Sequence, residues 1–357
     1  MEIPDDKLSL ITSRLQEIIG LDELQKIIQS RPLKIYFGTA PTGRIHIGYL
    51  VPLLKIADFL KAGCEVKILF ADLHAVLDNL KSTMQQVEFR TSYYEKMIKS
   101  ILKNLNVPLD KLTFVRGSSF QLSQAYTMDM YKISTLATLH DAKKAGAEVV
   151  KQTDNPKMSG LLYPILQALD EQYLDVDAQF GGVDQRKLFT FAADVLPLIG
   201  YKKRIHLMNP MLTAINAMPK DSNENTNISE IKMSSSDLNS KIDMLDSKNE
   251  IKKKINRAYC LEGDLSFNPL MELMKHVTFP LLNNCGSSIF KINRKEIHGG
   301  PLSFSNYADL EKDFVEKKLH PQDLKTGIID CLNLFMEPIR AEFNDKESQS
   351  LIKQAYN

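Results

Sequence analysis

The chain has 357 residues, enough for one large and one smaller domain, and its 43% hydrophobic and 25% charged residues are typical of a globular protein. Its 45 basic and 44 acidic residues leave a net charge of +1, which excludes binding to nucleic acid through overall basicity. The four cysteines are scattered without a C-x-x-C pair, and no apolar run approaches the roughly 18 residues of a membrane span. These features argue against zinc and membrane proteins and predict a cytoplasmic location.

The first part of the chain predicts the opening of a parallel sheet. Residues 1–31 alternate apolar and charged positions and predict one or two amphipathic helices. Residues 35–37 predict a buried strand, a turn and a helix follow, Gly63 ends that helix, and residues 66–71 predict the next strand. Strand, helix and parallel strand in this order require a right-handed crossover.

The segment His46-Ile47-Gly48-Tyr49 lies where the helix after the first strand begins. Backbone N–H groups and the positive helix end favour an anion there, and Gly48 allows a ligand close to the backbone. His46 and the preceding Thr42 can donate hydrogen bonds to a phosphate. The alternative is a polar loop whose side chains only cap the helix.

The strand at 66–71 is followed by Asp72 and His74, at the sheet edge where ligands collect in α/β folds. These two residues either contact a ligand or cap the next segment. Residues 84–105 predict a long amphipathic helix, and residues 112–116 predict a strand. The helical segment 122–147 is either a subunit interface or part of the core.

The polar residues Tyr163, Gln167 and Asp170 are spaced i, i+4, i+7, so a helix places them on one face. Pro164 indicates that Tyr163 lies near a helix start or a kink. A solvent-exposed polar face is the alternative. A short strand at 178–180 and a Gly-Gly turn follow, and Gln185-Arg186 opens another helix.

Residues 220–229 are polar and predict a mobile loop, which is followed by Lys232-Met233-Ser234-Ser235-Ser236. A lysine and a run of hydroxyls on a loop suit a clamp for phosphate, with a serine-rich linker as the alternative. Ser247 and Glu250 form a predicted capping box that opens a mainly helical C-terminal part. We therefore place a domain boundary near residue 245.

Together these segments resemble the tyrosyl-tRNA synthetases of the eukaryotic and archaeal type, from about Leu33 to Tyr356. Residues 46–49 are similar to the HIGH signature of class I synthetases, with Tyr49 in place of the last histidine. Residues 232–236 are similar to the KMSKS signature, with Ser235 in place of the second lysine. Each signature is weak alone, but the pair in this order around residues 161–186 is specific.

The resemblance implies an α/β fold: a Rossmann-like parallel-sheet catalytic domain (1–212), a mobile loop region (213–245) and an all-helical anticodon-binding domain (246–357). It implies a tyrosine–tRNA ligase that forms tyrosyl-adenylate from L-tyrosine and ATP and then charges tRNA(Tyr). It also implies Mg²⁺ with ATP, no structural metal, no membrane contact, and a homodimer joined through the helices around residues 105–150.

The resemblance also assigns residues. The implied catalytic residues are Thr42, His46, Gly48, Lys232, Ser234 and Ser235. The implied ATP-binding residues are Thr42, His46, Gly48, Tyr49, Asp184, Lys232 and Met233. Tyr36 and Asp170 would bind the phenol of the substrate tyrosine. The ammonium group of that tyrosine would be bound by Tyr163, Gln167 and Gln185. Contacts with tRNA would come from Arg186, Lys143, Lys144, Lys187, His320 and Asp323, although His320 could equally be a helix cap.

Three alternatives remain. The tryptophan enzyme shares the fold and signatures but has no need of a phenol-directed Tyr36 and Asp170. Small nucleotidyltransferases use a similar turn but are generally shorter and lack a helical C-terminal domain. A catalytically inactive RNA-binding relative is disfavoured because His46, Lys232 and Asp170 are intact.

Overall fold

The computed structural model describes residues 5–77, 83–149, 157–219, 233, 240–287 and 289–357. Its main sheet has six strands in the order β1-β6-β5-β2-β3-β4, and a second sheet pairs β7 with β8. The strands are β1 (Glu17–Ile19), β2 (Lys34–Thr39), β3 (Glu65–Phe70), β4 (Leu112–Arg116), β5 (Ala178–Gly182), β6 (Ile205–Asn209), β7 (Phe290–Ile292) and β8 (Leu302–Phe304). β2 to β6 are parallel, as predicted, whereas β1 joins the edge antiparallel to β6.

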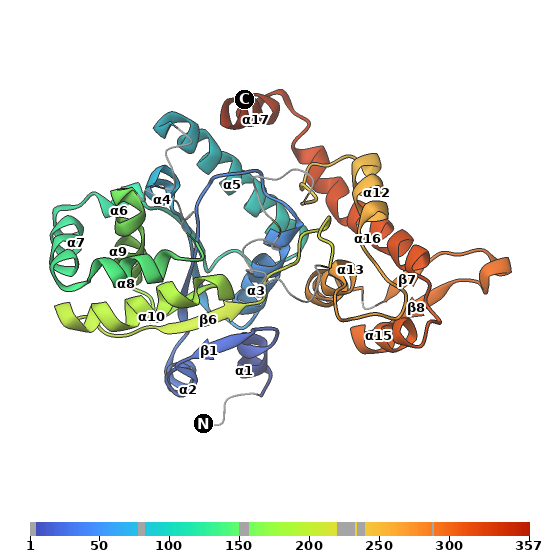
Figure 1. The fold of residues 1–357 in the computed structure, drawn as a ribbon, viewed down its shortest axis with the longest axis horizontal. Helices are drawn as coiled ribbons and strands as arrows, with labels where there is room; N and C mark the ends of the chain where they lie inside the picture. The colour runs from blue at the N-terminus through green and yellow to red at the C-terminus, as the bar shows by residue number, and fades with distance from the viewer. Residues whose placement is uncertain (1–4, 78–82, 150–156, 220–232, 234–239, 288) are drawn as a thin grey trace.

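Helices connect the strands and form most of the C-terminal part (Figure 1). Up to β6 they are α1 (Asp5–Thr12), α2 (Leu21–Ser30), η1 (Ile47–Tyr49), α3 (Leu50–Lys61), α4 (Asp72–Leu77), α5 (Met84–Asn104), α6 (Ser118–Gln121), α7 (Gln124–Leu136), α8 (Leu139–Gly146), α9 (Met158–Tyr173), η2 (Val183–Gln185), α10 (Arg186–Val195) and η3 (Leu196–Ile199). After β6 they are α12 (Lys248–Arg257), α13 (Pro269–Leu273), η4 (Met274–Thr278), α14 (Phe279–Asn284), η5 (Glu296–His298), α15 (Tyr307–Val315), α16 (Pro321–Glu342) and α17 (Lys346–Tyr356).

Alternation along β2 gives the sheet two buried faces. Ile35 and Phe37 join the large core that contains α3 and α5, whereas Tyr36 joins a separate cluster with Leu69 and Leu174. Successive strand residues point to opposite faces, so Tyr36 necessarily points away from its two neighbours. This places the Tyr36 hydroxyl on the side of the sheet covered by α9.

Local signals in the sequence set several element ends. Gly63 follows α3 with φ +80°, and the Cys64 N–H bonds to the Phe59 carbonyl at 2.9 Å, which closes the helix. Ser247 and Glu250 form the predicted capping box of α12. α9 continues through Pro164, so Tyr163 lies within the helix and not at its start.

Three predictions of secondary structure need correction. Residues 17–19 form β1 and not part of a helix, because β6 offers a free edge that pairs Glu17 with Met208. The C-terminal part is predominantly helical, as expected, but it also contains the β7–β8 pair, so it is not all-helical. The glycines at 181 and 182 end β5 and do not form a separate turn.

The C-terminal helix returns to the sheet-containing part of the molecule. α17 packs on α5, where Arg90 Nε donates to the Ala355 carbonyl at 2.8 Å. The Tyr356 hydroxyl donates to the Gly43 carbonyl at 3.0 Å, and the Tyr94 hydroxyl reaches the same oxygen at 2.7 Å. The loop before His46 is therefore supported from behind by both α5 and α17. Within the described ranges, no helix has the length and apolar character needed to cross a bilayer.

Candidate active site

A cavity of about 600 Å³ lies at the carboxyl ends of the parallel strands. Thr39, Gly182 and Asn209, the last residues of β2, β5 and β6, all line it. The five residues implied for tyrosine also line it: Tyr36, Tyr163, Gln167, Asp170 and Gln185. So do six of those implied for ATP: Thr42, His46, Gly48, Tyr49, Asp184 and Met233. Segments separated by well over a hundred residues therefore converge on one cavity.

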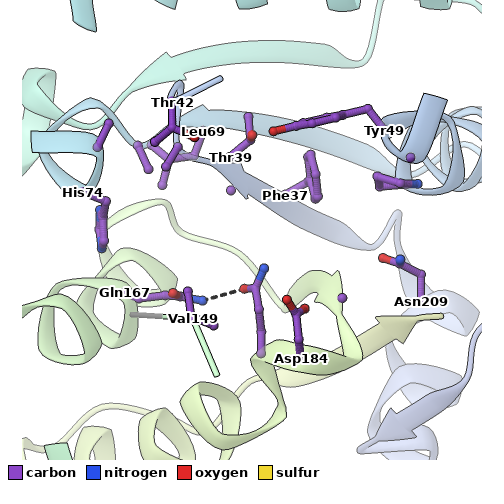
Figure 2. A pocket seen from close by; sticks show the side chains of 18 of the residues that line it. Phe37, Thr39, Thr42, Tyr49, Leu69, His74, Val149, Gln167, Asp184 and Asn209 are labelled. Carbon is purple, nitrogen blue, oxygen red and sulfur yellow. Dashed lines mark hydrogen bonds between the residues drawn. The ribbon is translucent and has the colours of Figure 1, made fainter. Parts of the chain in front are cut away.

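The labelled side chains divide the cavity into two ends (Figure 2). His74 and Gln167 lie at one end, and Tyr49 and Asn209 lie at the other. Asp184 points into the space between the two walls. Of the labelled residues, Gln167 is implied for the amino acid and Tyr49 for the nucleotide, so we call the end at Gln167 the amino-acid end and the end at Tyr49 the nucleotide end.

A buried carboxylate, Asp170, occupies the amino-acid end. Its Oδ1 accepts a hydrogen bond from Gln121 Nε2 at 2.7 Å and lies 2.9 Å from the Tyr126 hydroxyl. Burial raises the pKa of Asp170 to about 8, although these two hydrogen bonds favour its ionised form. Burial, and then the charge of Asp170, also raises the pKa of the Tyr36 hydroxyl well above its usual value. Tyr36 therefore stays protonated and can donate or accept.

Two amides and a second phenol surround the same end. Gln167 Nε2 donates to Gln185 Oε1 at 2.8 Å, as Figure 2 shows by its dashed line, and the Tyr36 hydroxyl lies 3.4 Å from the Gln167 carbonyl. The ring of His74 meets that of Tyr163 edge-on, with centroids 4.5 Å apart. Burial lowers the pKa of His74 to about 4, so this ring is neutral near pH 7. The end combines oxygen acceptors with neutral aromatic walls.

His46 begins η1 and is held by the backbone around it. Its Nδ1 accepts from the Gly48 N–H at 3.2 Å, and its backbone pairs with Asp243 in an isolated bridge. Burial, with a smaller effect from the charge of Lys241, lowers the pKa of His46 to about 3. Because Nδ1 accepts, the proton of the neutral ring lies on Nε2.

Gly48 is required by its own surroundings. A Cβ there would lie 2.8 Å from His46 Cε1 and 3.5 Å from the sulfur of Met233. Any side chain at this position would displace the imidazole that it holds. The two signature segments meet here, since the sulfur of Met233 lies beside Gly48, and the backbone N–H of Met233 donates to the Leu212 carbonyl at 3.0 Å. Lys232, Ser234, Ser235 and the polar segment 220–229 lie outside the described residues.

The residues implied for tRNA lie outside this cavity. Arg186 pairs with Glu17 at 2.8 Å, and Lys187 pairs with Glu148 at 2.8 Å. Lys143 and Lys144 are exposed in the last turn of α8.

The two residues implied for the anticodon lie at the start of α16. His320 is the N-cap of this helix, and its Nδ1 accepts from the Gln322 N–H at 3.1 Å. Asp323 pairs with Arg294 at 3.3 Å. His320 therefore caps a helix and is also exposed.

Several polar residues of the site were missed from the sequence. Gln121 and Tyr126 contact Asp170 from a segment whose pattern indicated only helix. Gln179 Oε1 and Asn209 Oδ1 are buried, line the cavity, and have no hydrogen-bond partner among the described residues. Asn209 could have been found as a strand-end residue, whereas Gln121 carries no local signal. Of the pair after β3, His74 lines the cavity, while Asp72 is not among the lining residues and accepts from Ser118 Oγ of α6 at 2.6 Å.

No metal site is evident at this cavity. Across the ranges that the structure describes, no three histidine, cysteine, aspartate or glutamate side chains are grouped to hold an ion.

Comparisons with known proteins agree with the geometry. A family model described as tRNA synthetases class I (W and Y) matches residues 29–337. The cytoplasmic tyrosine--tRNA ligase of Gallus gallus is 53% identical over 353 residues, which cover 99% of this chain and 64% of the relative. The probable cytoplasmic tyrosine--tRNA ligase of Encephalitozoon cuniculi is 50% identical over 353 residues, which cover 99% of both chains.

A solved structure extends the likeness to three dimensions. The tyrosyl-tRNA synthetase of Archaeoglobus fulgidus, complexed with L-tyrosine, is 30% identical and superposes with a TM-score of 0.82 over 95% of this chain and 99% of that one. The chain spans less than two-thirds of the length of the Gallus gallus relative. The family model covers most of the chain, and the Encephalitozoon cuniculi relative matches half of its residues over 99% of both chains. The chain therefore belongs to the class I tRNA synthetases for tryptophan and tyrosine, on the branch of the tyrosine--tRNA ligases.

Proposed function

We propose that this protein activates L-tyrosine with ATP and transfers the tyrosyl group to the 3′ end of tRNA(Tyr). The observation that carries the proposal is the convergence of Tyr36, Asp170 and the Tyr163–Gln167–Gln185 group on one cavity, next to His46. A phenol, a carboxylate and two amides suit an amino acid that has a hydroxyl at one end and an ammonium group at the other.

In the first step the carboxylate of tyrosine attacks the α-phosphorus of ATP. A bond forms between a carboxylate oxygen and that phosphorus, the bond from that phosphorus to the oxygen bridging to the β-phosphate breaks, and pyrophosphate leaves with that oxygen. A carboxylate is already a nucleophile, so the protein's task is positioning and stabilisation of charge. ATP enters as its Mg²⁺ complex, with the ion carried by the phosphates.

The nucleotide end of the cavity supplies neutral donors. Thr42 and the Nε2–H of His46 would bind phosphate oxygens, and Gly48 and Tyr49 would lie along the nucleotide. Asp184 and Met233 would contact the nucleotide from the opposite wall. Lys232, Ser234 and Ser235 would supply the cation and hydroxyls of the second signature; they lie outside the described residues.

Selection of tyrosine would depend on the buried end. The phenol of the substrate tyrosine would bind Asp170 and Tyr36. The ammonium group of the same tyrosine would bind Tyr163, Gln167 and Gln185. Phenylalanine would leave a buried carboxylate without its ligand partner, at a cost of about 1–3 kcal/mol or more. Binding therefore discriminates without a separate editing step.

The second step needs contacts beyond the cavity. A terminal hydroxyl of tRNA takes the tyrosyl group from the adenylate, and AMP leaves. Arg186, Lys143, Lys144 and Lys187 would bind the acceptor end of tRNA. His320 and Asp323 would bind the anticodon from the domain at 246–357, with 1–212 as the catalytic domain and 213–245 as the loop region between them.

The expected location follows the relatives' names, and the expected assembly follows the family resemblance and one surface. We expect a cytoplasmic homodimer, joined through an exposed apolar face that we call the α6–α9 face. Its side chains are 47–71% exposed and comprise Leu122, Met128, Tyr131, Leu136, Leu139 and Met158. A patch of large apolar side chains on one side of a protein commonly marks an interface.

Exchange of labelled pyrophosphate into ATP tests the activity. Purified protein should support exchange with tyrosine but not with phenylalanine or tryptophan, and it should then charge tRNA(Tyr). Asp170→Ala should lower both the rate and the discrimination against phenylalanine. Asp175→Ala, at an exposed carboxylate that pairs with Lys34, is the control and should change neither.

The other outcomes are equally informative. Exchange that depends on tryptophan would assign the protein to the sister specificity. The absence of exchange with any of the three amino acids would leave an RNA-binding relative without this catalytic activity.

A further inference from the structure

The carboxylate of Asp170 is held by two residues on a different segment of the chain. Gln121, the last residue of α6, donates to Asp170 Oδ1 at 2.7 Å, and the Tyr126 hydroxyl, on α7, lies 2.9 Å from the same oxygen. All three side chains are buried. Buried polar groups in such contact act as a unit and not as separate surface residues.

Both contacts reach one oxygen of the carboxylate. Asp170 lines the cavity, so Oδ2 is the oxygen left to meet a ligand. The Tyr126 hydroxyl also lies 2.7 Å from the carbonyl of Leu166, one turn before Asp170, and its ring packs edge-on against Tyr173 with centroids 4.8 Å apart. Tyr126 is therefore fixed at both its hydroxyl and its ring.

We propose that Gln121 and Tyr126 are positioning residues for tyrosine recognition, which favour the ionised form of Asp170 and orient its Oδ2 toward the phenol of the substrate. The inference rests on the proposed function and adds two residues that do not themselves contact the substrate. A charged acceptor gives the stronger hydrogen bond to a phenol than a protonated carboxyl group would.

The charges around Asp170 show why donors are needed there. Burial disfavours the ionised carboxylate, and Glu171 on the same helix and Asp72 on α4 disfavour it further. Gln121 and Tyr126 act in the opposite direction. Without these two hydrogen bonds, a larger fraction of Asp170 is protonated. When phenylalanine leaves Asp170 without a ligand partner, the free-energy cost is smaller for a protonated carboxyl group than for an ionised one. The two donors should therefore raise discrimination as well as affinity.

Two variants remove the donors separately. Tyr126→Phe deletes only the hydroxyl, and Gln121→Met deletes the amide at similar length. In pyrophosphate exchange each should raise the KM for tyrosine about tenfold with a much smaller change in kcat, as expected for the loss of one hydrogen bond to a charged group. The ratio of kcat/KM for tyrosine to that for phenylalanine should fall about tenfold.

Tyr173→Phe is the matched control. The Tyr173 hydroxyl donates to Asp129 at 2.9 Å, and the Tyr173 ring contacts Tyr126. The substitution therefore removes a phenolic hydroxyl next to Tyr126 without removing a contact to Asp170. It should lower the melting temperature without changing the tyrosine-to-phenylalanine ratio. An unchanged ratio in both Tyr126→Phe and Gln121→Met overturns the proposal, as does an equal fall in Tyr173→Phe.

The wild-type protein separates this inference from the proposed function. Exchange with tyrosine in the wild type, together with unchanged ratios in the variants, removes only the role of Gln121 and Tyr126. A wild type that supports no exchange with tyrosine overturns both. If Tyr126→Phe fails to fold, Gln121→Met on its own decides the outcome.

Discussion

The imidazole of His46 is neutral, and this defines what it can contribute to catalysis. Burial lowers its pKa to about 3, and its Nδ1 is engaged by the Gly48 N–H, so the ring offers one donor, Nε2–H. The ring therefore offers a ligand a directed hydrogen bond and no positive charge.

Asp170 predicts a specific pH dependence of stability. Its pKa is about 8 in the folded protein and about 4 in an unfolded chain, so between these values the folded state holds the extra proton. Stability therefore falls as pH rises through this window. Asp170→Asn removes the effect, and its unfolding free energy relative to wild type should increase from pH 5 to pH 8 by on the order of 1 kcal/mol or more.

Urea unfolding at the two pH values measures this difference. Asp175→Asn is the control, because the Lys34 ammonium lowers the pKa of Asp175 and its carboxylate is ionised throughout the range. Its difference from wild type should be the same at both values. A pH-independent difference for Asp170→Asn would show that this carboxylate is ionised in the folded protein at pH 5.

The C-terminal part is organised around the long helix α16. It packs against α12 on one side and α5 and β7 on others, so it joins the C-terminal part to the sheet-containing part. The contact with β7 is unusually close at Gly327, where a Cβ would lie 2.6 Å from Phe290 Cζ and 2.9 Å from Ile292 Cγ1. A glycine in a helix interior normally costs about 1 kcal/mol relative to alanine, and here close packing explains its presence.

Gly327→Ala should destabilise the protein despite the better helix propensity of alanine. The added methyl group must displace Phe290 or Ile292, which costs about 1–3 kcal/mol and exceeds the gain in propensity. Chemical unfolding gives the change. Asp330→Ala, on the exposed side of the same helix, is the control and should be neutral or slightly stabilising. A more stable Gly327→Ala variant would mean that β7 moves away from α16 without cost.

The whole molecule carries the α6–α9 face on the side opposite the C-terminal part (Figure 1). α6 and α7 of this face also carry Gln121 and Tyr126 on their buried side. The surface expected to join two subunits and the residues that hold Asp170 are therefore two sides of the same segment.

Introducing charge on this face tests the expected dimer. Wild-type protein should have twice the 40.5 kDa mass of the chain in solution, and Leu122→Glu with Met128→Glu should yield the monomer mass. Burial of two carboxylates in an apolar interface is costly, so association should weaken by at least a hundredfold. Sedimentation equilibrium measures the masses. Leu334→Glu, on a side chain that is 79% exposed on α16, is the control and should keep the wild-type mass; loss of the dimer there instead would place the interface on α16.

Much of the fold could be predicted because its signals are local. The strands at 35–37 and 112–116 and the long helix after residue 84 lie where the sequence predicted them. β1 was missed, since the pattern around Ile18 and Ile19 suits a helix as well as a strand, and only the edge of β6 decides between them. The residues proposed to bind tyrosine and ATP were named through the resemblance to the synthetase family, and their roles stay predictions.

The sequence by itself determined the helix ends at Gly63 and Ser247, the strand–helix order and the two signature segments, because each depends on residues a few positions apart. Only the tertiary structure decided that Gln121 and Tyr126 meet Asp170. It also decided that His46 is neutral and that Tyr356 supports the loop at Gly43. Contacts between residues tens to hundreds of positions apart, and the burial that shifts a pKa, arise from packing, and no short stretch of sequence encodes them.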